Sequence, residues 1–151
     1  MSDCKKELNA DEVVKILELQ PHPEGGYYKE TYQCALQCPV PYSDSTRSVS
    51  TCIYYLLKQG DKSHFHRIKS DETWHFYGGG SMSVTVLQDD GTLRVHRLGL
   101  NLREGERPQF TVGANQWFAA EPNESTDYAL VGVSGLSKFY GVFDFKFKLD
   151  Q

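Results

Sequence analysis

Long apolar runs and an excess of positive charge are both missing from this sequence of 151 residues. No segment approaches the roughly 20 apolar residues that a membrane-spanning helix needs, and the opening residues hold no apolar stretch of the length found in signal peptides. Sixteen Lys and Arg stand against twenty Asp and Glu, so the formal net charge is −4. Nucleic acid polymers are bound through a basic surface, which this composition disfavours. We therefore expect a cytoplasmic protein whose partners include neither a membrane nor a nucleic acid polymer.

Cysteine is scarce as well, with four residues, Cys4, Cys34, Cys38 and Cys52. Three residues separate Cys34 from Cys38, a spacing typical of neither a redox pair nor a zinc finger. Because no secretory signal is found, we expect all four to be reduced thiols.

Helical periodicity is confined to one stretch, about residues 10–20. Asn9 can cap its first turn, Glu12 can complete a capping box, and Pro21 ends it. From residue 26 onward apolar and polar residues alternate, which is typical of half-buried strands. Turn-forming residues separate the expected strands, which are Tyr27–Gln33, Ser48–Leu57, Glu72–Tyr77, Met82–Leu87, Leu93–Leu98, Phe110–Val112, Gln116–Ala119, Asp127–Val133 and Phe139–Phe147.

Short strands at regular spacing after one helix, without a βαβ rhythm, indicate an all-β antiparallel sandwich or barrel. We expect one domain over residues 1–151, with the barrel at about residues 26–148. The last strand places four Phe on one face. Such an amphipathic strand near a chain end is expected in the core or in a subunit interface.

The densest group of chemically active side chains lies in residues 63–75, which hold three of the five histidines. On an extended chain His64 and His66 point to the same face, and Glu72 can lie opposite them on the next strand. Two imidazoles and a carboxylate can bind a first-row metal. Without a metal, His66 can serve as a general base, or both histidines can be solvated polar residues at a strand end. In a regular strand Glu72 and Trp74 share one face, and His75 lies on the other.

These residues resemble the first cupin motif, with Gly60, His64, His66, Glu72 and Gly79 in its places. More specifically, the chain is similar to the domain-of-unknown-function family 985, also called cupin type 5. The resemblance runs from about residue 17 to 146, and its most specific strings are Pro23–Tyr28 and Asp71–His75. It implies a double-stranded β-helix, the jelly-roll or cupin barrel, like that of the rhamnose-pathway sugar-nucleotide epimerases. It also implies a homodimer with a ligand inside the barrel, but it assigns no reaction.

One departure from the cupin pattern bears on the metal. Metal-binding cupins take a fourth ligand, a His, from a second motif, and in this sequence Phe118 stands at that position. An apolar residue there favours an apolar floor, so we expect no cofactor. The similarity to the epimerases also implies an Asp partner for the catalytic histidine, and no position in the sequence can be assigned to it.

Ten residues are candidates for ligand binding because they are polar or aromatic and can face the barrel interior: Tyr28, Arg47, Ser63, His64, His66, Glu72, Trp74, Gln109, Trp117 and Tyr140. Of these, His66 and Glu72 are also candidates for catalysis. His22 and His96 lie outside the cluster and receive no role.

Three functions are compatible with these features. The first is a homodimeric cupin that binds a nucleotide or nucleotide-sugar, with isomerase- or epimerase-like activity in which His66 is the base and Tyr28 or Tyr140 the acid. The second is a metal-dependent isomerase or oxygenase with His64, His66 and Glu72 as ligands. The third is a non-catalytic binding or structural cupin.

Overall fold

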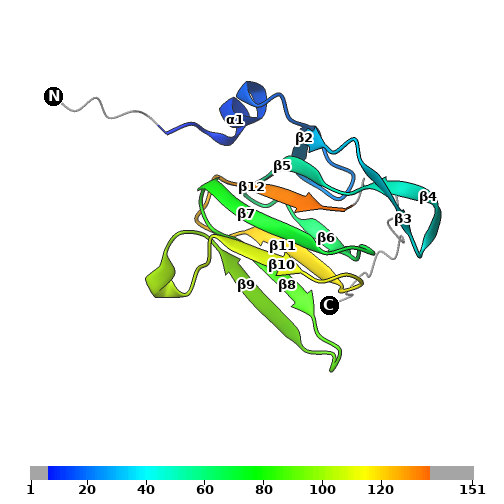
Figure 1. Ribbon diagram of the computed structural model, residues 1–151. Helices are drawn as coiled ribbons and strands as arrows, with labels where there is room; N and C mark the ends of the chain where they lie inside the picture. Colours follow the sequence, from blue (N-terminus) through cyan, green and yellow to red (C-terminus); the bar gives the residue numbers. More distant parts are fainter. Residues whose placement is uncertain (1–6, 137–151) are drawn as a thin grey trace.

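Two antiparallel sheets and a separate hairpin contain the strands of the computed structural model, which describes residues 7–136 (Figure 1). The six-stranded sheet has the order β1 (Gln20–Pro21), β2 (Tyr27–Gln33), β5 (Thr51–Lys58), β12 (Tyr128–Gly135), β7 (Glu72–Gly79) and β10 (Gln109–Val112). The four-stranded sheet has the order β6 (Ser63–His66), β11 (Phe118–Pro122), β8 (Met82–Leu87) and β9 (Leu93–Leu98). The hairpin consists of β3 (Gln37–Val40) and β4 (Ser43–Ser48).

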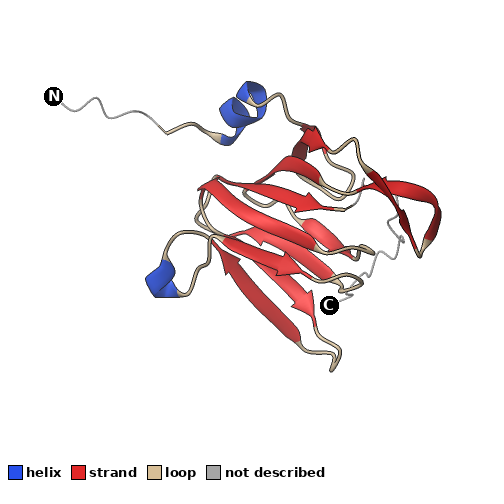
Figure 2. Cartoon of the chain, in the orientation of Figure 1, coloured by secondary structure: helices blue, strands red, loops and turns tan. Residues whose placement is uncertain are grey.

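The core lies between the two sheets because the inward residues of both are apolar. Five of these inward side chains are fully buried: Leu57 and Val131 of the larger sheet, and Met82, Val84 and Phe118 of the smaller one. All of them belong to one hydrophobic cluster. Strands dominate the fold and the helical segments lie at its periphery (Figure 2). The predicted all-β antiparallel jelly-roll class is confirmed.

The helix α1 (Ala10–Ile16) begins where the sequence predicts. The Glu12 backbone N–H donates to Asn9 Oδ1 at 3.0 Å, and the Asn9 N–H donates to Glu12 Oε2 at 2.9 Å. The helix ends four residues before the predicted residue 20, because Glu18 adopts a left-handed conformation and the chain then enters β1. No helix in residues 7–136 is long and apolar enough to cross a membrane.

Strands β2, β8 and β9 have the predicted bounds. The β3–β4 hairpin was not predicted, since its residues show no regular alternation of apolar and polar side chains. The predicted strand 48–57 is interrupted, because Ser48 is the last residue of β4 and β5 begins at Thr51. At this break the Ser48 hydroxyl donates to the carbonyls of Cys34 and Ser50. The predicted strand 116–119 begins later, at Phe118, because residues 113–116 form a turn with Asn115 left-handed. The predicted strand Phe139–Phe147 lies outside the described residues.

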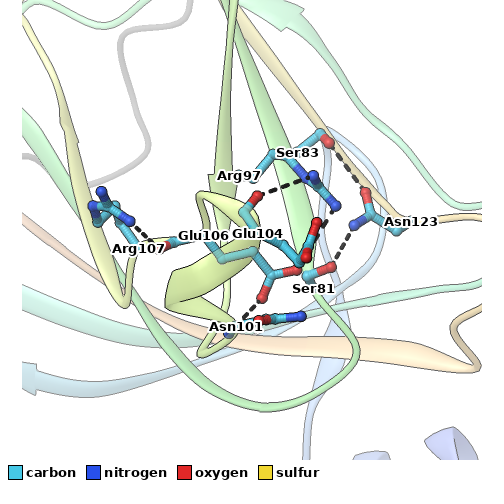
Figure 3. A network of polar contacts seen from close by, with 8 residues as sticks. All are labelled: Ser81, Ser83, Arg97, Asn101, Glu104, Glu106, Arg107 and Asn123. Atoms are coloured by element: carbon cyan, nitrogen blue, oxygen red, sulfur yellow. Dashed lines mark hydrogen bonds and ion pairs between the residues drawn. The ribbon is translucent and has the colours of Figure 1, made fainter.

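A polar network closes one end of the barrel, where β9 leads through the short helix η1 (Leu102–Glu104) to β10 (Figure 3). The carboxylate of Glu106 is 10% exposed and accepts the Asn101 N–H at 2.9 Å. The second carboxylate oxygen of Glu106, Oε1, lies 3.9 Å from Nη2 of Arg97. A Cβ at Gly99 would overlap this carboxylate, so only glycine leaves it room. This end is therefore a packed, hydrogen-bonded loop.

Candidate functional site

A β-bulge in β6 decides which histidine faces the interior. Across the pairing with β11, Phe118 lies opposite His66 and Ala120 lies opposite Ser63. Two steps along β11 thus match three steps along β6, which is the signature of one extra residue. Ser63 and His66 are both buried, at 2% and 9% exposure, while His64 is exposed. The expectation that His64 and His66 share a face was wrong, because the bulge reverses the alternation between them.

The imidazole of His66 is held by the residue two positions before it. Its Nδ1 lies 2.7 Å from the carbonyl oxygen of His64. A carbonyl can only accept, so Nδ1 carries the hydrogen and Nε2 of the neutral ring keeps its lone pair. Burial lowers the pKa of His66, and this keeps the ring neutral near pH 7. The side chain therefore offers an unprotonated nitrogen at a buried position.

Aromatic rings continue from His66 across the core. The Phe118 ring centroid is 4.3 Å from that of His66 and 6.0 Å from that of Trp74, and these two rings are nearly perpendicular. Tyr55 lies 5.8 Å from Trp74, and His22 lies 5.2 Å from Tyr55. Phe118 is fully buried. The position that holds a fourth ligand in metal-binding cupins is thus an apolar wall beside His66.

Glu72, at the start of β7, is joined to this chain of rings through Trp74. Trp74 Nε1–H donates to Glu72 Oε2 at 3.0 Å, so the two side chains share a face as predicted. Burial raises the pKa of Glu72 to about 7, against the smaller opposing effect of the Trp74 bond. His75 lies on the other face, where its Nε2 is 3.1 Å from Ser134 Oγ. Glu72 is therefore an acid poised near neutral pH.

The turn that follows β1 brings the chain back to the site, over residues 22–26. Gly25 has a φ of 107°, and a Cβ there would overlap the carbonyl oxygen of Lys62. The Tyr55 hydroxyl donates to the Gly25 carbonyl at 2.7 Å. Within the turn, the Glu24 N–H donates to Nδ1 of His22 at 2.9 Å, so the neutral His22 ring carries its hydrogen on Nε2. The turn packs closely on β5 and on the start of β6.

His22 is a site residue that the sequence analysis missed. Its ring lies 4.9 Å from that of Tyr28, edge to face. Burial first, and the charge of His66 second, lower the pKa of His22 to about 4. The Gly25–Gly26 pair signals a tight turn in the sequence, but the return of His22 toward β5 depends on packing between segments distant in the chain. Tyr55 was missed for the same reason.

The remaining candidates lie at several places. Gln109 is exposed and pairs with His75 on the outer face of β7, so it does not join the cluster, because the alternation in β10 turns Phe110 and Val112 inward instead. Trp117 precedes β11 and lies under the guanidinium of Arg67, 5.3 Å from the ring centre. Arg47 is on the β3–β4 hairpin, opposite Cys38. Tyr140 lies outside the described residues.

The three residues of the predicted metal alternative do not converge. The bulge turns His64 toward solvent, while His66 and Glu72 face the core. Within residues 7–136, no group of three or more His, Cys, Asp or Glu side chains is placed to hold a metal ion. The described residues therefore do not fit a three-ligand metal centre formed by His64, His66 and Glu72.

Two stacked antiparallel sheets with a buried histidine at the end of one strand define a cupin barrel. The chain belongs to the Cupin_5 family of the cupin superfamily, DUF985, whose profile matches residues 11–140. The family predicted from the sequence is thus confirmed. The similarity to the sugar-nucleotide epimerases stays a prediction.

Several proteins are similar to this chain over most of its length. SO0799 from Shewanella oneidensis is 38% identical, with 88% of this chain and 80% of that one covered and a TM-score of 0.77. A hypothetical protein from Leishmania major is 28% identical, with 91% and 88% covered and a TM-score of 0.82. The uncharacterized protein YML079W of Saccharomyces cerevisiae is 29% identical over 128 residues, which are 77% of this chain and 63% of the yeast protein. None of these names carries an activity.

A more distant likeness concerns the fold alone. Oxalate decarboxylase from Bacillus subtilis is 18% identical, with 78% of this chain and 26% of the enzyme covered and a TM-score of 0.55. The decarboxylase is described as having Mn(II) centres. The chain therefore shares a barrel with a manganese enzyme, and its own site has to be interpreted from its own residues.

Proposed function

We propose that this cupin binds a small polar ligand in its barrel and moves protons on that ligand without a metal, as an isomerase or epimerase. The supporting observation is the hydrogen bond from His66 Nδ1 to the His64 carbonyl, which leaves Nε2 as a base. Glu72 supplies the matching acid, since a pKa of about 7 keeps its carboxyl protonated in part at neutral pH. A base that is unprotonated at neutral pH and an acid whose pKa is about 7 suit proton transfer on carbon.

The chemical step follows from these two groups. Nε2 of His66 takes the proton from a carbon next to a carbonyl, and the C–H electron pair forms the C=C bond of an enol. Glu72 gives its proton to the carbonyl oxygen at the same time, so the site holds an imidazolium and a carboxylate. Return of a proton to carbon and of the enol proton to Glu72 completes the cycle. Phe118 packs on His66 and Trp74 bonds Glu72, and because both rings are almost fully buried they exclude water from the sides of the two groups that they cover.

The ligand class is the less constrained part of the proposal. A nucleotide or nucleotide-sugar is supported by the resemblance to the epimerase-type cupins, a fold-level argument. A homodimer in the cytoplasm is proposed on the same resemblance and on the amphipathic sequence 139–147, which suits a subunit interface.

The first experiment is a set of thermal melts of EDTA-treated protein with nucleotides, nucleotide-sugars and divalent metals. A ligand at 100 times its Kd stabilises the fold by about 2.7 kcal/mol, which is several degrees for a domain of this size. Each stabilising compound is then incubated in D2O and examined by NMR for deuterium at carbon. We expect exchange in the wild type and a loss of about 100-fold or more in His66→Asn, whose amide can still donate to the His64 carbonyl.

His64→Ala is the matched control, because it removes the exposed imidazole and keeps the His64 carbonyl. It should exchange deuterium as the wild type does. Equal exchange in His66→Asn and the wild type would contradict the proposal. So would stabilisation by Fe, Mn, Ni or Zn that is lost in His66→Asn.

A further inference from the structure

The turn over residues 22–26 is fixed to the site by two consecutive carbonyl groups. The Glu24 carbonyl accepts the backbone N–H of His64 at 3.3 Å. The next carbonyl, of Gly25, accepts the Tyr55 hydroxyl at 2.7 Å. Tyr55 is 3% exposed, so its hydroxyl is removed from bulk water and depends on its protein partners, the Gly25 carbonyl and the Ser63 side chain. The turn is thus bonded at once to β5 and to β6.

The His64 peptide links this turn to the imidazole of His66. Its N–H is held by Glu24, and its carbonyl accepts the His66 Nδ1–H at 2.7 Å. A peptide bonded on both sides cannot rotate without breaking one of the bonds. If the turn moved, the carbonyl would leave Nδ1, and the buried ring would lose the contact that selects its tautomer.

We infer that this turn is a positioning element of the site: it fixes the tautomer of His66 through the His64 peptide. The catalytic meaning of the inference rests on the proposed function. The positioning itself is a property of the ligand-free protein and can be tested without a substrate.

The tautomer is measured by long-range 1H–15N NMR of full-length protein with labelled histidine. We expect His66 to carry its hydrogen on Nδ1 in the wild type and to show both tautomers in Tyr55→Phe, which loses the bond to Gly25 and a side-chain hydrogen bond to Ser63. Ser63→Ala removes the second bond alone and should keep the Nδ1 tautomer. Tyr54→Phe is the matched control, since it removes the neighbouring hydroxyl from the other face of β5 and should leave the spectrum unchanged. An unchanged His66 spectrum in Tyr55→Phe would overturn the inference. Gly25→Ala is less suitable, because the overlap with Lys62 is expected to prevent folding.

These results separate the inference from the proposed function. If the tautomer responds as expected while no compound undergoes exchange, the turn positions His66 but the proposed reaction is wrong. If exchange occurs and depends on His66 while the Tyr55→Phe spectrum matches that of the wild type, the reaction stands and the inference fails.

Discussion

The barrel buries a carboxyl group at each end, and the two groups have different surroundings. Glu106 accepts the Asn101 N–H and faces Arg97, in a loop that closes its end of the barrel (Figure 3). For Glu72, at the opposite end, the one donor recorded among residues 7–136 is Trp74 Nε1–H, and aromatic rings continue from there. A buried carboxylate with donors stabilises the fold, and one with few donors keeps its proton. The surroundings of Glu106 therefore stabilise the fold, whereas those of Glu72 suit the proposed proton transfer.

The largest effect is expected from Glu106→Ala. It leaves the Asn101 N–H without its acceptor and opens a cavity next to Gly99, so the free energy of unfolding should fall by about 3–4 kcal/mol. Urea denaturation at pH 7 measures this. Glu104→Ala in the same loop is the control and should change little, because Arg97 bonds the Glu104 backbone carbonyl. A loss as small as that of the control would end the contrast between the two barrel ends.

Glu72→Gln should have the opposite sign. The amide oxygen can still accept from Trp74, and the variant has no charge to bury. Because the folded-state pKa of about 7 lies above the ordinary value of 4.5, the wild type loses stability as the pH rises from about 4.5 through 7. The variant should therefore be more stable by about 2–3 kcal/mol at pH 8 and equal to the wild type at pH 4. Denaturation at several pH values checks this, and a difference independent of pH would refute it.

His22→Gln tests a second titratable group of the candidate site, one whose effect on stability is expected at acidic pH. The folded-state pKa of about 4 lies below the ordinary value of 6.5, so the wild type loses stability as the pH falls from about 6.5 to 4. Between pH 7 and pH 5 this loss is about 1–2 kcal/mol. It should be absent from the variant, as measured by the change of Tm with pH. Parallel curves for the two proteins would show that His22 is not buried as a neutral ring.

Glu18→Gln is the smallest expected effect and sets the baseline for the carboxyl groups. Glu18 pairs with Lys29 on the surface, and its side chain is 77% exposed. Exposed pairs contribute little because water and salt screen them. Its Tm should match that of the wild type within error at pH 7 and at high salt. A clear loss at low salt would show that surface pairs contribute as buried ones do.

Local patterns predicted most of the fold and part of the site. The capping residue Asn9 fixed the start of the helix, and alternation alone placed β2, β8 and β9. The shared face of Glu72 and Trp74 was predicted because β7 is regular at its start. The bulge in β6 interrupts the period without a signal in residue type, so the inward histidine pair was predicted wrongly.

Long-range packing accounts for the rest of the site. His22 approaches Tyr55 only because the 22–26 turn packs on β5 and on Lys62, and nothing in the local sequence indicates that pairing. The hairpin β3–β4 forms without an apolar alternation, from backbone pairing between Gln37 and Ser48 and between Cys38 and Arg47. Periodicity predicts which face a residue takes, and it does not predict which distant segment covers that face.

The bulge in β6 also limits how this barrel can evolve. His64 and His66 point apart because the strand has one residue more than its partner, so no single amino acid replacement at either position can bring both imidazoles inside. Deletion of Phe65 would restore the alternation, but it would leave the two histidines adjacent and therefore still on opposite faces. Because Ser63 is the other buried polar residue of this strand, position 63 rather than position 64 is where a second inward imidazole would have to arise.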